Sequence, residues 1–397
     1  MIYTLQAPSV IQTEVHLPAS KSISNRVLIL NVLSKSPYPI ENLSDSDDTR
    51  ALYQALQSSA SELDVGAAGT SMRFLTACLS QRDASPQPSR WTITGSDRMK
   101  NRPIGLLVDA LRQCGAEIAY LEKEGFPPLH IHGRKLRGGK IVLNGGVSSQ
   151  YISALLMIAP CMENGLTLCL EGNVVSQPYI RMTLGLMEQF GIEAHWEDSV
   201  IEIPPQPYVP HPFRVESDWS AASYWYEIQA LAPENSRIER IGLEKNSLQG
   251  DAKVERLFEQ LLRTNGLFRY DFVHEPDLAQ TFAVTCCLLN KPFRFTGLQS
   301  LRIKETDRLI ALQTELRKLG YPIQIESDSV LEWTGERCAA DPHPVIATYE
   351  DHRMAMAFAP ACLKTGEIRI ADPGVVSKSY PRYWDDLAAA GFIITEN

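Results

Sequence analysis

Lysine, arginine and serine side chains gather before an apolar run near the start of the chain. The segment LPASKSISNRVLIL, residues 17–30, puts Lys21 and Arg26 among three serines at the expected start of a helix. Backbone N–H groups at a helix start already carry partial positive charge, so two fixed cations there should repel each other and the helix dipole. Because ammonium, guanidinium and hydroxyl groups suit phosphate or carboxylate, the segment indicates an anion-binding site. A solvated helix N-cap with incidental charges is the alternative.

A second loop carries cations ahead of a predicted helix. The segment DRMKNRPIGLLVDAL supplies Arg98, Lys100 and Arg102 just before Pro103, which is a favourable first residue of a helix. Three closely spaced cations are also common on a solvated surface. Taken alone, this segment does not distinguish a binding site from a surface.

A third loop offers neutral hydrogen-bonding groups. The segment GGVSSQYISALLM places Ser148, Ser149 and Gln150 after two glycines. It is not a nucleotide-binding P-loop, because the pattern G-x-x-x-x-G-K-[ST] fails. One serine could cap the helix, whereas the three residues together suit hydrogen bonds to phosphate or hydroxyl oxygens.

The segment LRIKETDRLIAL combines cations with a carboxylate. Lys304, Arg308 and Leu312 are each four residues apart, so a continuous helix would place both cations on one face. Glu305 would then lie one position round, close enough to be held by them. An exposed helix with ordinary ion pairs is the alternative, and the spacing alone does not decide between the two.

Charged residues also precede or follow other apolar runs. The segment YEDHRMAMAFAPACL puts Asp351, His352 and Arg353 at a helix start, followed by methionines expected in the core. The segment PDLAQTFAV carries Asp277 in the corresponding place, and VVSKSYPRYW carries Lys378 near the C-terminus. These residues are candidates for helix caps or for the phosphate end of a site.

Motifs for metals and cofactors are weak. His130 and His132 alternate as on one face of a strand, but no third ligand is close in the sequence. The patterns G-x-S-x-G and G-x-G-x-x-G, typical of hydrolases and dinucleotide-binding proteins, do not occur. We therefore expect no metal and no cofactor.

Composition narrows the class of protein further. A chain of 397 residues is expected to form two or three domains. The formal net charge of -9 disfavours nucleic acid as a partner, and no apolar run is long enough for a membrane span. Eight cysteines without framework spacing, together with no visible secretory signal, indicate reduced thiols. We expect a cytoplasmic monomer with small-molecule substrates.

The elements that must position these residues recur along the chain. Six polar loops each lead into an apolar helix, at PASKSISNRVLIL, GAAGTSMRFLTACL, GGVSSQYISALLM, SDWSAASYWYEI, PDLAQTFAVTCCL and YEDHRMAMAFAPACL. Between them, helix ends are predicted to close on glycines in the left-handed conformation and to turn into strands. These glycines are Gly115, Gly191, Gly266, Gly320 and Gly391. We infer six repeated units, of which the first lacks the closing glycine.

A proline-rich segment divides these units into two groups of three. Residues 204–212, PPQPYVPHP, contain five prolines in nine residues and are the predicted domain boundary. Helix starts from two such domains could face each other across a cleft, with their positive ends converging on an anionic ligand.

Taken together, these motifs resemble the enolpyruvyl transferase family, and most closely its branch that acts on shikimate 3-phosphate. The resemblance runs through LPASKSISNR, DSDDTR, AAGTSMRFL, RMKNRPIGLLVDAL, VSSQYISALLM, VSQPYI, RIKETDR and EDHRMAMAF, which span nearly the whole chain. It implies an α/β protein with two inside-out α/β barrel domains, each of three βαβαββ units. One domain would comprise residues 1–18 and 217–397, and the other, inserted domain residues 19–216.

The resemblance also implies a reaction and its residues. The enolpyruvyl group of phosphoenolpyruvate would move to the 5-hydroxyl of shikimate 3-phosphate with release of phosphate, in the pathway to chorismate and aromatic amino acids. The family's phosphoenolpyruvate site would fall on Lys21, Gly69, Arg102, Gln150, Arg308, Arg353 and Lys378. Its shikimate 3-phosphate site would fall on Lys21, Ser22, Arg26, Ser148, Ser149, Gln150, Ser176, Tyr179, Asp277, Ser300 and Lys304.

Two carboxylates would carry the acid–base chemistry. By the resemblance, Asp277 would take the hydroxyl proton and Glu305 would protonate the methylene carbon, with Lys21 assisting. A Glu flanked by cations is held ionised, so its role as donor requires desolvation when substrate binds. The two roles could be exchanged between addition and elimination.

This chain departs from the family pattern at two places. Ala67 stands where an Asn is usual, which predicts altered sensitivity to inhibitors that mimic phosphoenolpyruvate, such as glyphosate. Ser300 also replaces an Asn and is a shorter hydrogen-bond donor. Neither change removes a charged residue.

Three other functions are alternatives. The branch that modifies UDP-N-acetylglucosamine has a reactive Cys before the RP helix, whereas the loop TGSDRMKNRP has none. An RNA 3'-phosphate cyclase is disfavoured by the acidic balance. A non-catalytic anion-binding homologue is disfavoured by Asp277 and Glu305, because anion binding alone does not call for carboxylates.

Overall fold

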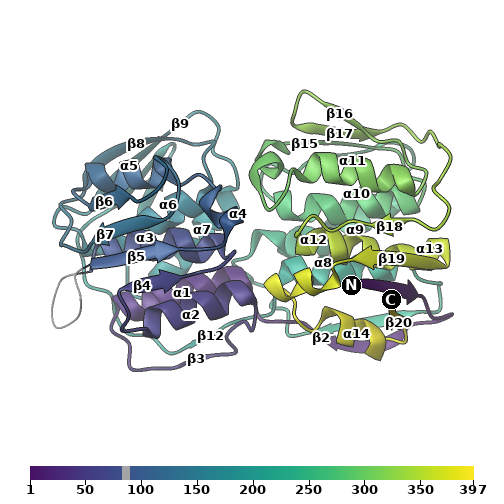
Figure 1. Ribbon diagram of the computed structural model, residues 1–397, viewed down its shortest axis with the longest axis horizontal. Helices are drawn as coiled ribbons and strands as arrows, with labels where there is room; N and C mark the ends of the chain where they lie inside the picture. Colours follow the sequence, from purple (N-terminus) through teal and green to yellow (C-terminus); the bar gives the residue numbers. More distant parts are fainter. Residues whose placement is uncertain (83–89) are drawn as a thin grey trace. The chain divides into compact units, whose positions relative to one another are not determined.

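The computed structural model describes residues 1–82 and 90–397, and the chain divides into two compact units. Unit 1 comprises Met1–Pro18 and Ser217–Asn397, and unit 2 comprises Ala19–Glu216 (Figure 1). Each unit has its own hydrophobic core. The prediction that residues 204–212 are the boundary is wrong, because this proline-rich segment lies inside unit 2 and the division falls after Pro18 and after Glu216.

Unit 2 is built around three helices that are buried on nearly every side. These are α1 (Lys21–Leu33), α3 (Gly69–Ser80) and α6 (Ser149–Ile158), which contact one another. Each follows one of the predicted polar loops. A helix that is apolar all round is expected at the centre of a core rather than at its surface.

Sheets and further helices complete unit 2. One sheet has the order β4 (Glu62–Asp64), β5 (Arg90–Thr94), β7 (Leu129–His132), β6 (Glu117–Tyr120), and another has the order β8 (Gly139–Asn144), β9 (Leu166–Glu171), β11 (Val200–Ile203), β10 (His195–Glu197). In both sheets the first pair is parallel and the others are antiparallel. The short strands β3 (Ile40–Glu41) and β12 (Phe213–Arg214) pair in parallel. The remaining helices are α2 (Asp47–Gln57), α4 (Asp97–Lys100), α5 (Gly105–Gln113), α7 (Gln177–Gln189) and the 3-10 turn η1 (Ala159–Cys161).

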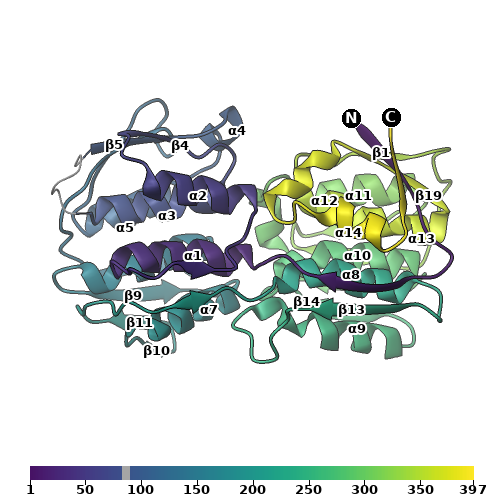
Figure 2. The same cartoon turned by 90° about the horizontal axis from the view of Figure 1, so that it is seen from below.

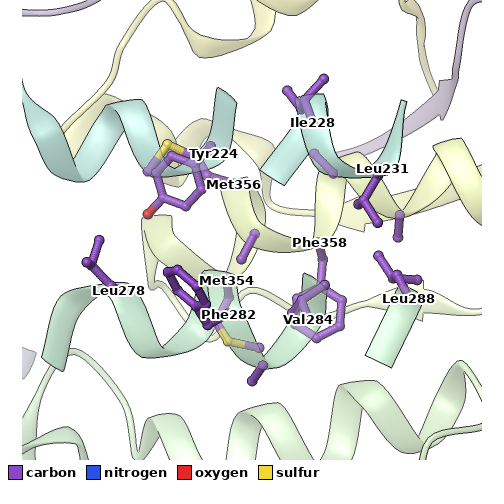
Figure 3. Packing of buried hydrophobic residues seen from close by; sticks show 14 of the residues in the cluster. Tyr224, Ile228, Leu231, Leu278, Phe282, Val284, Leu288, Met354, Met356 and Phe358 are labelled. Carbon is purple, nitrogen blue, oxygen red and sulfur yellow. The ribbon is translucent and has the colours of Figure 1, made fainter. Parts of the chain in front are cut away.

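Unit 1 repeats this plan around α8 (Trp219–Leu231), α10 (Ala279–Leu288) and α12 (His352–Phe358). Figure 3 shows side chains of these helices packed together, with Tyr224 from α8, Phe282 from α10 and Met354 from α12 among them. Met354 and Met356 are buried in this core, which confirms that the methionines serve in packing. The Asp277 and Arg353 side chains therefore start from elements with a rigid core behind them.

The sheets of unit 1 include one that joins both ends of the chain (Figure 2). Its order is β18 (Val345–Ile346), β19 (Glu367–Ala371), β1 (Ile2–Gln6), β20 (Ile393–Glu396), so the N-terminal strand lies between two C-terminal strands. Leu5 is opposite Ile368 on one side and Ile394 on the other. The second sheet has the order β14 (Phe268–Asp271), β15 (Phe293–Thr296), β17 (Val330–Trp333), β16 (Gln324–Glu326), and β2 (Gln12–His16) pairs in parallel with β13 (Arg237–Ile241).

The remaining helices of unit 1 are α9 (Val254–Arg263), α11 (Arg308–Lys318), α13 (Cys362–Thr365) and α14 (Tyr383–Ala389). Short 3-10 turns occur at η2 (Gly250–Lys253), η3 (Pro276–Leu278), η4 (Gln299–Ile303), η5 (Ala359–Ala361) and η6 (Pro373–Lys378). Several of these turns carry the predicted site residues, as described below.

The predicted glycine caps are confirmed at Gly115, Gly191, Gly320 and Gly391, which directly follow the C-caps of α5, α7, α11 and α14 and have φ of 100°, 78°, 87° and 96°. The prediction is wrong for Gly266: its φ is also positive, at 89°, but α9 already ends at the C-cap Thr264 in an extended conformation. Helix α2 ends without a glycine, at a C-cap Ser58 in an extended conformation.

Two properties concern the chain as a whole. Within residues 1–82 and 90–397, no helix is both long and apolar enough to cross a bilayer. All eight cysteines lie in the described residues, and none of them forms a disulfide.

Candidate active site

Lys21 is the first residue of α1, so its ammonium lies at the helix start as the sequence predicts. The N-cap is Ser20, whose hydroxyl accepts a hydrogen bond from the Ile23 N–H at 3.5 Å. The Lys21 Nζ atom lies 3.5 Å from a carboxylate oxygen of Asp48, and the Lys21 side chain keeps 16% exposure. The cation is therefore balanced by a carboxylate of the DSDDTR segment while remaining within reach of a ligand.

Arg26 lies deeper than the sequence suggested. It is 3% exposed, and its guanidinium donates to Thr183 Oγ1 at 2.7 Å, to Ser153 Oγ at 3.1 Å and to the Ser22 carbonyl at 2.9 Å. A longer bond reaches the Tyr179 carbonyl at 3.4 Å. Burial lowers the pKa of Arg26 to about 10, with Tyr179 acting in the opposite sense. Arg26 therefore links α1 to α6 and α7 from inside.

Gly69 begins α3 at a place where two guanidinium groups approach the backbone. A Cβ atom at Gly69 would lie 2.6 Å from a terminal nitrogen of Arg102 and 2.6 Å from one of Arg73. Only glycine leaves room for both cations in these positions. Pro103 is not the first residue of a helix: α5 begins at Gly105, and the Arg102 residue belongs to the loop after α4.

Hydroxyl and amide groups lie at two further helix starts of unit 2. Ser148 is the N-cap of α6, where its hydroxyl accepts from the Gln150 N–H at 3.4 Å, and Ser149 is the first helical residue. The Gln150 side chain donates to Thr70 Oγ1 at 3.1 Å, which ties α6 to α3. Ser176 precedes α7 with φ of 54°, an uncommon backbone conformation for a residue other than glycine. Such outliers are frequent at functional sites.

Arg308 is the central residue of a network of ion pairs in unit 1. Its Nε donates to Asp351 at 2.7 Å, one terminal nitrogen donates to Asp277 at 3.0 Å, and the other donates to Glu305 at 2.9 Å. The side chain is 2% exposed, and Asp351 is fully buried. Burial alone would lower the pKa of Arg308, but Asp351, Glu305 and Asp277 raise it above its ordinary value. The guanidinium therefore holds both predicted catalytic carboxylates in fixed positions.

Asp277 lies in η3, just before α10, among three cations. Its carboxylate is 3.0 Å from Arg308, 3.1 Å from Arg353 and 3.7 Å from Lys304. Burial by itself would raise the pKa of Asp277, but Arg353, Lys304 and Arg308 together hold that pKa well below its usual range. Without substrate, Asp277 is therefore an ionised carboxylate and a weak base.

Lys304 is not on the face of α11 that the sequence predicted. Residues 299–303 form η4, Lys304 follows that turn with ψ of -146°, and α11 starts only at Arg308. Asp307 restarts the helix because its carboxylate accepts from the Leu309 and Ile310 N–H groups, each at 3.2 Å. Lys304 nevertheless reaches Asp277, and its burial lowers its pKa, which Asp277 partly offsets.

Glu305 and Arg353 each have a second partner. The Lys378 Nζ, from η6, lies 3.5 Å from the Glu305 carboxylate. Arg353 donates to the Tyr224 hydroxyl at 3.3 Å, and its own N–H is capped by Asp351 at 2.9 Å. Ser300 lies in η4 and is half-buried. All unit 1 candidates except Ser300 thus belong to one connected network of ion pairs.

Sequence reasoning missed the roles of three charged residues in these groups. Asp48 balances Lys21, Arg73 approaches Gly69, and Asp351, predicted only as a cap or part of a phosphate site, also binds Arg308. Asp48 and Arg73 both lie inside family motifs, DSDDTR and AAGTSMRFL, so their place in a motif was a usable signal. No local pattern connects Asp351 to Arg308, which is 43 residues away.

Among the described residues, no group of three or more His, Cys, Asp or Glu side chains could hold a metal ion. His130 and His132 do share one face of β7, where they lie near Thr92 and Glu117 respectively. Each unit offers cations and hydrogen-bond donors for anionic oxygen atoms, and unit 1 also carries the carboxylates of Asp277 and Glu305.

Comparison with known proteins identifies a family that the sequence matches. The sequence matches the family model described as EPSP synthase (3-phosphoshikimate 1-carboxyvinyltransferase) over residues 5–60 and 54–387. A 3-phosphoshikimate 1-carboxyvinyltransferase of Bacteroides fragilis is 56% identical over 409 residues, which cover 99% of this chain and 98% of the relative. One of Vibrio cholerae is 38% identical over 430 residues, covering 97% and 98%.

Solved structures agree on the fold. An EPSP synthase from Acinetobacter baumannii superimposes with a TM-score of 0.79 at 20% sequence identity and covers 100% of both chains. The enolpyruvyl transferase NikO from Streptomyces tendae superimposes with a TM-score of 0.75 at 14% identity, covering 100% of this chain and 98% of that one. The mixed α/β fold described above is therefore one that enolpyruvyl transferases adopt.

Proposed function

The chain belongs to the EPSP synthase family, and on this premise we propose which of its residues carry out the reaction of that family. Its activity is that of a 3-phosphoshikimate 1-carboxyvinyltransferase. It transfers the enolpyruvyl group of phosphoenolpyruvate to the 5-hydroxyl of shikimate 3-phosphate and releases phosphate. This reaction is a step of the shikimate pathway, which leads to chorismate and the aromatic amino acids.

We propose that phosphoenolpyruvate binds to the residues that the family pattern assigns to it. Arg102, Lys21, the amide of Gln150 and the open backbone at Gly69 would contact its oxygens. The same is proposed for Arg308, Arg353 and Lys378. In support, Arg353 lies 3.1 Å from Asp277 and Lys378 lies 3.5 Å from Glu305, so both cations adjoin the proposed catalytic carboxylates. Guanidinium groups are well suited to pairs of phosphate or carboxylate oxygens.

We propose that shikimate 3-phosphate binds to hydroxyl groups at helix starts and to the further polar residues that the family pattern assigns to it. Ser22, Ser148, Ser149 and Ser176 would donate to its phosphate oxygens. Arg26 would act with them through the Ser22 and Tyr179 carbonyls that it holds. The remaining proposed contacts to the ring and its hydroxyls are Lys21, Gln150, Tyr179, Asp277, Ser300 and Lys304.

The observation that carries the catalytic proposal is that one guanidinium holds two carboxylates. The two terminal nitrogens of Arg308 bind Asp277 and Glu305 separately, so the carboxylates are fixed but kept apart. We propose that Asp277 accepts the hydroxyl proton while Glu305 protonates the methylene carbon, so that the hydroxyl oxygen bonds to the neighbouring carbon and a tetrahedral intermediate forms. The intermediate then loses phosphate and one proton of its new methyl group, which restores the enolpyruvyl double bond. Lys21 would assist.

Without substrate, Asp277 is a weak base, and binding of the anionic substrates should make it a stronger one. The cations that lower the pKa of Asp277 are Arg353, Lys304 and Arg308, the same groups proposed to bind the anionic substrates. When substrate anions neutralise part of that positive charge, the proton affinity of Asp277 rises. Desolvation would raise the proton affinity of Glu305 in the same way.

We further propose that each unit is an inside-out α/β barrel of three βαβαββ units, with the buried helices inside and the sheets outside. The domains would be residues 1–18 with 217–397, and residues 19–216. The repeated strand order, in which a parallel pair is followed by two antiparallel neighbours, supports this. We propose that the protein acts as a monomer in the cytoplasm.

Phosphate release tests the reaction and the role of Glu305 together. We expect release from phosphoenolpyruvate only when shikimate 3-phosphate is also present, and a loss of at least about 100-fold in kcat for Glu305→Gln. Glu326→Gln is the matched control, because Glu326 also pairs with an arginine of unit 1, Arg294, but lies on β16. It should keep normal turnover.

Three outcomes would change the conclusion. Release without shikimate 3-phosphate would indicate a simple phosphatase. Binding of both ligands by calorimetry without release would favour a non-catalytic anion-binding homologue. Equal loss of turnover in both variants would remove the specific role proposed for Glu305.

A further inference from the structure

A buried carboxyl group in unit 1 is not used by the reaction as proposed above. Asp251 lies in η2 and is 3% exposed. Ser220 donates a hydrogen bond to its Oδ2, whereas its Oδ1 is buried with no hydrogen-bond partner among the described residues. Burying an ionised carboxylate with one unsatisfied oxygen costs free energy. Burying the neutral carboxylic acid costs much less.

The segment around Asp251 is attached firmly to the start of α8. Gln249 accepts from the Trp219 N–H at 3.1 Å and donates to the Ser217 carbonyl at 2.8 Å. Ser220 is the second residue of α8, and Tyr224, one turn further on, contacts Arg353. Asp251 is therefore held in place on the helix that also supports a residue of the anion site.

The groups around Asp251 favour its neutral form. Burial and the charge of Asp277 raise the pKa of Asp251 to about 7, and Asp218 acts in the same direction. The Ser220 hydrogen bond and Arg353 act in the opposite direction. Other titratable groups nearby are Tyr270, whose raised pKa owes a small part to Asp251, and the ion pair of Lys253 with Glu275.

The protonation state of Asp251 changes the net charge of the ion-pair network beside it. Four cations, Lys304, Arg308, Arg353 and Lys378, face three carboxylates, Asp277, Glu305 and Asp351. The network therefore has one net positive charge while Asp251 is neutral. Ionisation of Asp251 would bring this local balance to zero.

We propose that Asp251 is a positioning residue that sets the charge of this network. As the neutral acid it leaves the positive charge that favours an anionic ligand, and as the carboxylate it cancels that charge. It acts through Asp277 and Arg353 and touches no substrate atom itself. The proposal deepens the function given above and rests on it, because the anionic ligand is phosphoenolpyruvate.

Binding of phosphoenolpyruvate as a function of pH tests this proposal on the full-length protein. Calorimetry between about pH 6 and about pH 8.5 should show the affinity of the wild type falling about three- to tenfold relative to Asp251→Asn, which stays neutral throughout. The ligand's own phosphate also gains charge near pH 6, but it does so equally with every variant.

Two further variants make the comparison specific. Ser220→Ala removes the hydrogen bond that favours the carboxylate, so the fall in affinity should move to higher pH. Glu275→Gln removes a neighbouring buried carboxyl already paired with Lys253, so the pH dependence should remain. Infrared difference spectra of the unliganded wild type should show a carboxylic acid band that is lost near pH 7 and is missing in Asp251→Asn.

The possible results separate the proposal from its alternatives. A pH dependence unchanged in Asp251→Asn, or no band that titrates near neutrality, would overturn the proposal. If Asp251→Asn fails to fold, Ser220→Ala and the wild-type spectra test the proposal in its place. If phosphoenolpyruvate binds to no variant, the proposed function fails instead, and the same titration with inorganic phosphate tests the charge effect by itself.

Discussion

At the scale of single residues, Asp351 shows how a helix cap can also organise a site. Its carboxylate binds the guanidinium of Arg308 and caps the N–H of Arg353, and it is fully buried. We expect Asp351→Asn to lower the free energy of unfolding by about 3 kcal/mol, because it leaves a buried cation partly uncompensated. Turnover should fall as well, since Arg308 holds Asp277 and Glu305.

The measurement for Asp351 is urea denaturation with activity assayed in parallel. Asp328→Asn is the matched control, because Asp328 also pairs with an arginine, Arg302, at 2.7 Å but is 92% exposed. Its loss should cost less than about 1 kcal/mol. Equal effects of the two substitutions would mean that burial of the Asp351 pair contributes nothing.

Gly69 illustrates a residue whose substitution should affect binding rather than folding. A Cβ there would meet the far ends of the Arg102 and Arg73 side chains; Arg73 is buried, whereas Arg102 is only partly buried and can move away. We therefore expect Gly69→Ala to raise the KM for phosphoenolpyruvate about tenfold, because Arg102 is displaced, with kcat changed less. The melting temperature should stay close to that of the wild type. A large loss of stability with unchanged KM would contradict this interpretation.

The residue types and their local spacing predicted much of the candidate site. They could not predict which side chains from distant parts of the sequence bind one another. Lys21 lies at a helix start as expected, because an N-cap serine and an apolar run are local signals. Arg26 in the same segment is used internally, since its partners Ser153 and Thr183 come from distant helices. Nothing in the spacing of KSISNR distinguishes these two cations.

At the scale of elements, the helix ends were predictable because a glycine cap is a local device. The prediction for Lys304 failed for an equally local reason: Asp307 restarts the helix, and the period of four was applied across that break. A cap residue followed by an apolar run should therefore have been given more weight than the spacing of charges.

Two glycines with positive φ allow the cost of backbone strain to be separated from the cost of crowding by neighbouring atoms. Gly266 and Gly320 both lie in unit 1 with φ of 89° and 87°. A Cβ at Gly266 would meet no atom within 4 Å, whereas one at Gly320 would lie 3.0 Å from the Cys338 carbonyl oxygen. We expect Gly266→Ala to cost about 1 kcal/mol and Gly320→Ala about 2 kcal/mol, measured by urea denaturation. Equal costs would show that the carbonyl moves aside freely.

At the scale of the whole molecule, the charge of the candidate site residues is opposite in sign to the net charge of the chain. The chain carries -9 overall, yet seven of its nine charged candidate site residues are basic. The pairing of Lys21 with Asp48, and of Arg308 with three carboxylates, holds these cations in place until anionic ligands arrive. Composition alone disfavoured nucleic acid but could not locate the basic groups, because the contacts that assemble them span distant parts of the sequence.

The N-terminal strand gives the furthest-reaching structural prediction. Strand β1 pairs with β19 and with β20, so both C-terminal strands depend on residues 2–6. The family resemblance implied that residues 1–18 join residues 217–397 in one domain, but no local pattern indicated this strand pairing, because the partners are more than 360 residues apart. Deletion of residues 1–7 should therefore leave β19 and β20 without their shared partner and destabilise unit 1 selectively.

Hydrogen exchange read by mass spectrometry can localise that effect. In the truncated protein, amides of β19 and β20 should lose protection by at least about 100-fold, whereas β8 and β9 of unit 2 should change little. Substituting Leu5, fully buried between Ile368 and Ile394, by Ala should give a weaker form of the same pattern. Uniform loss of protection in both units would mean that the two cores unfold as one cooperative block, and unchanged protection would show that β1 is dispensable for its sheet.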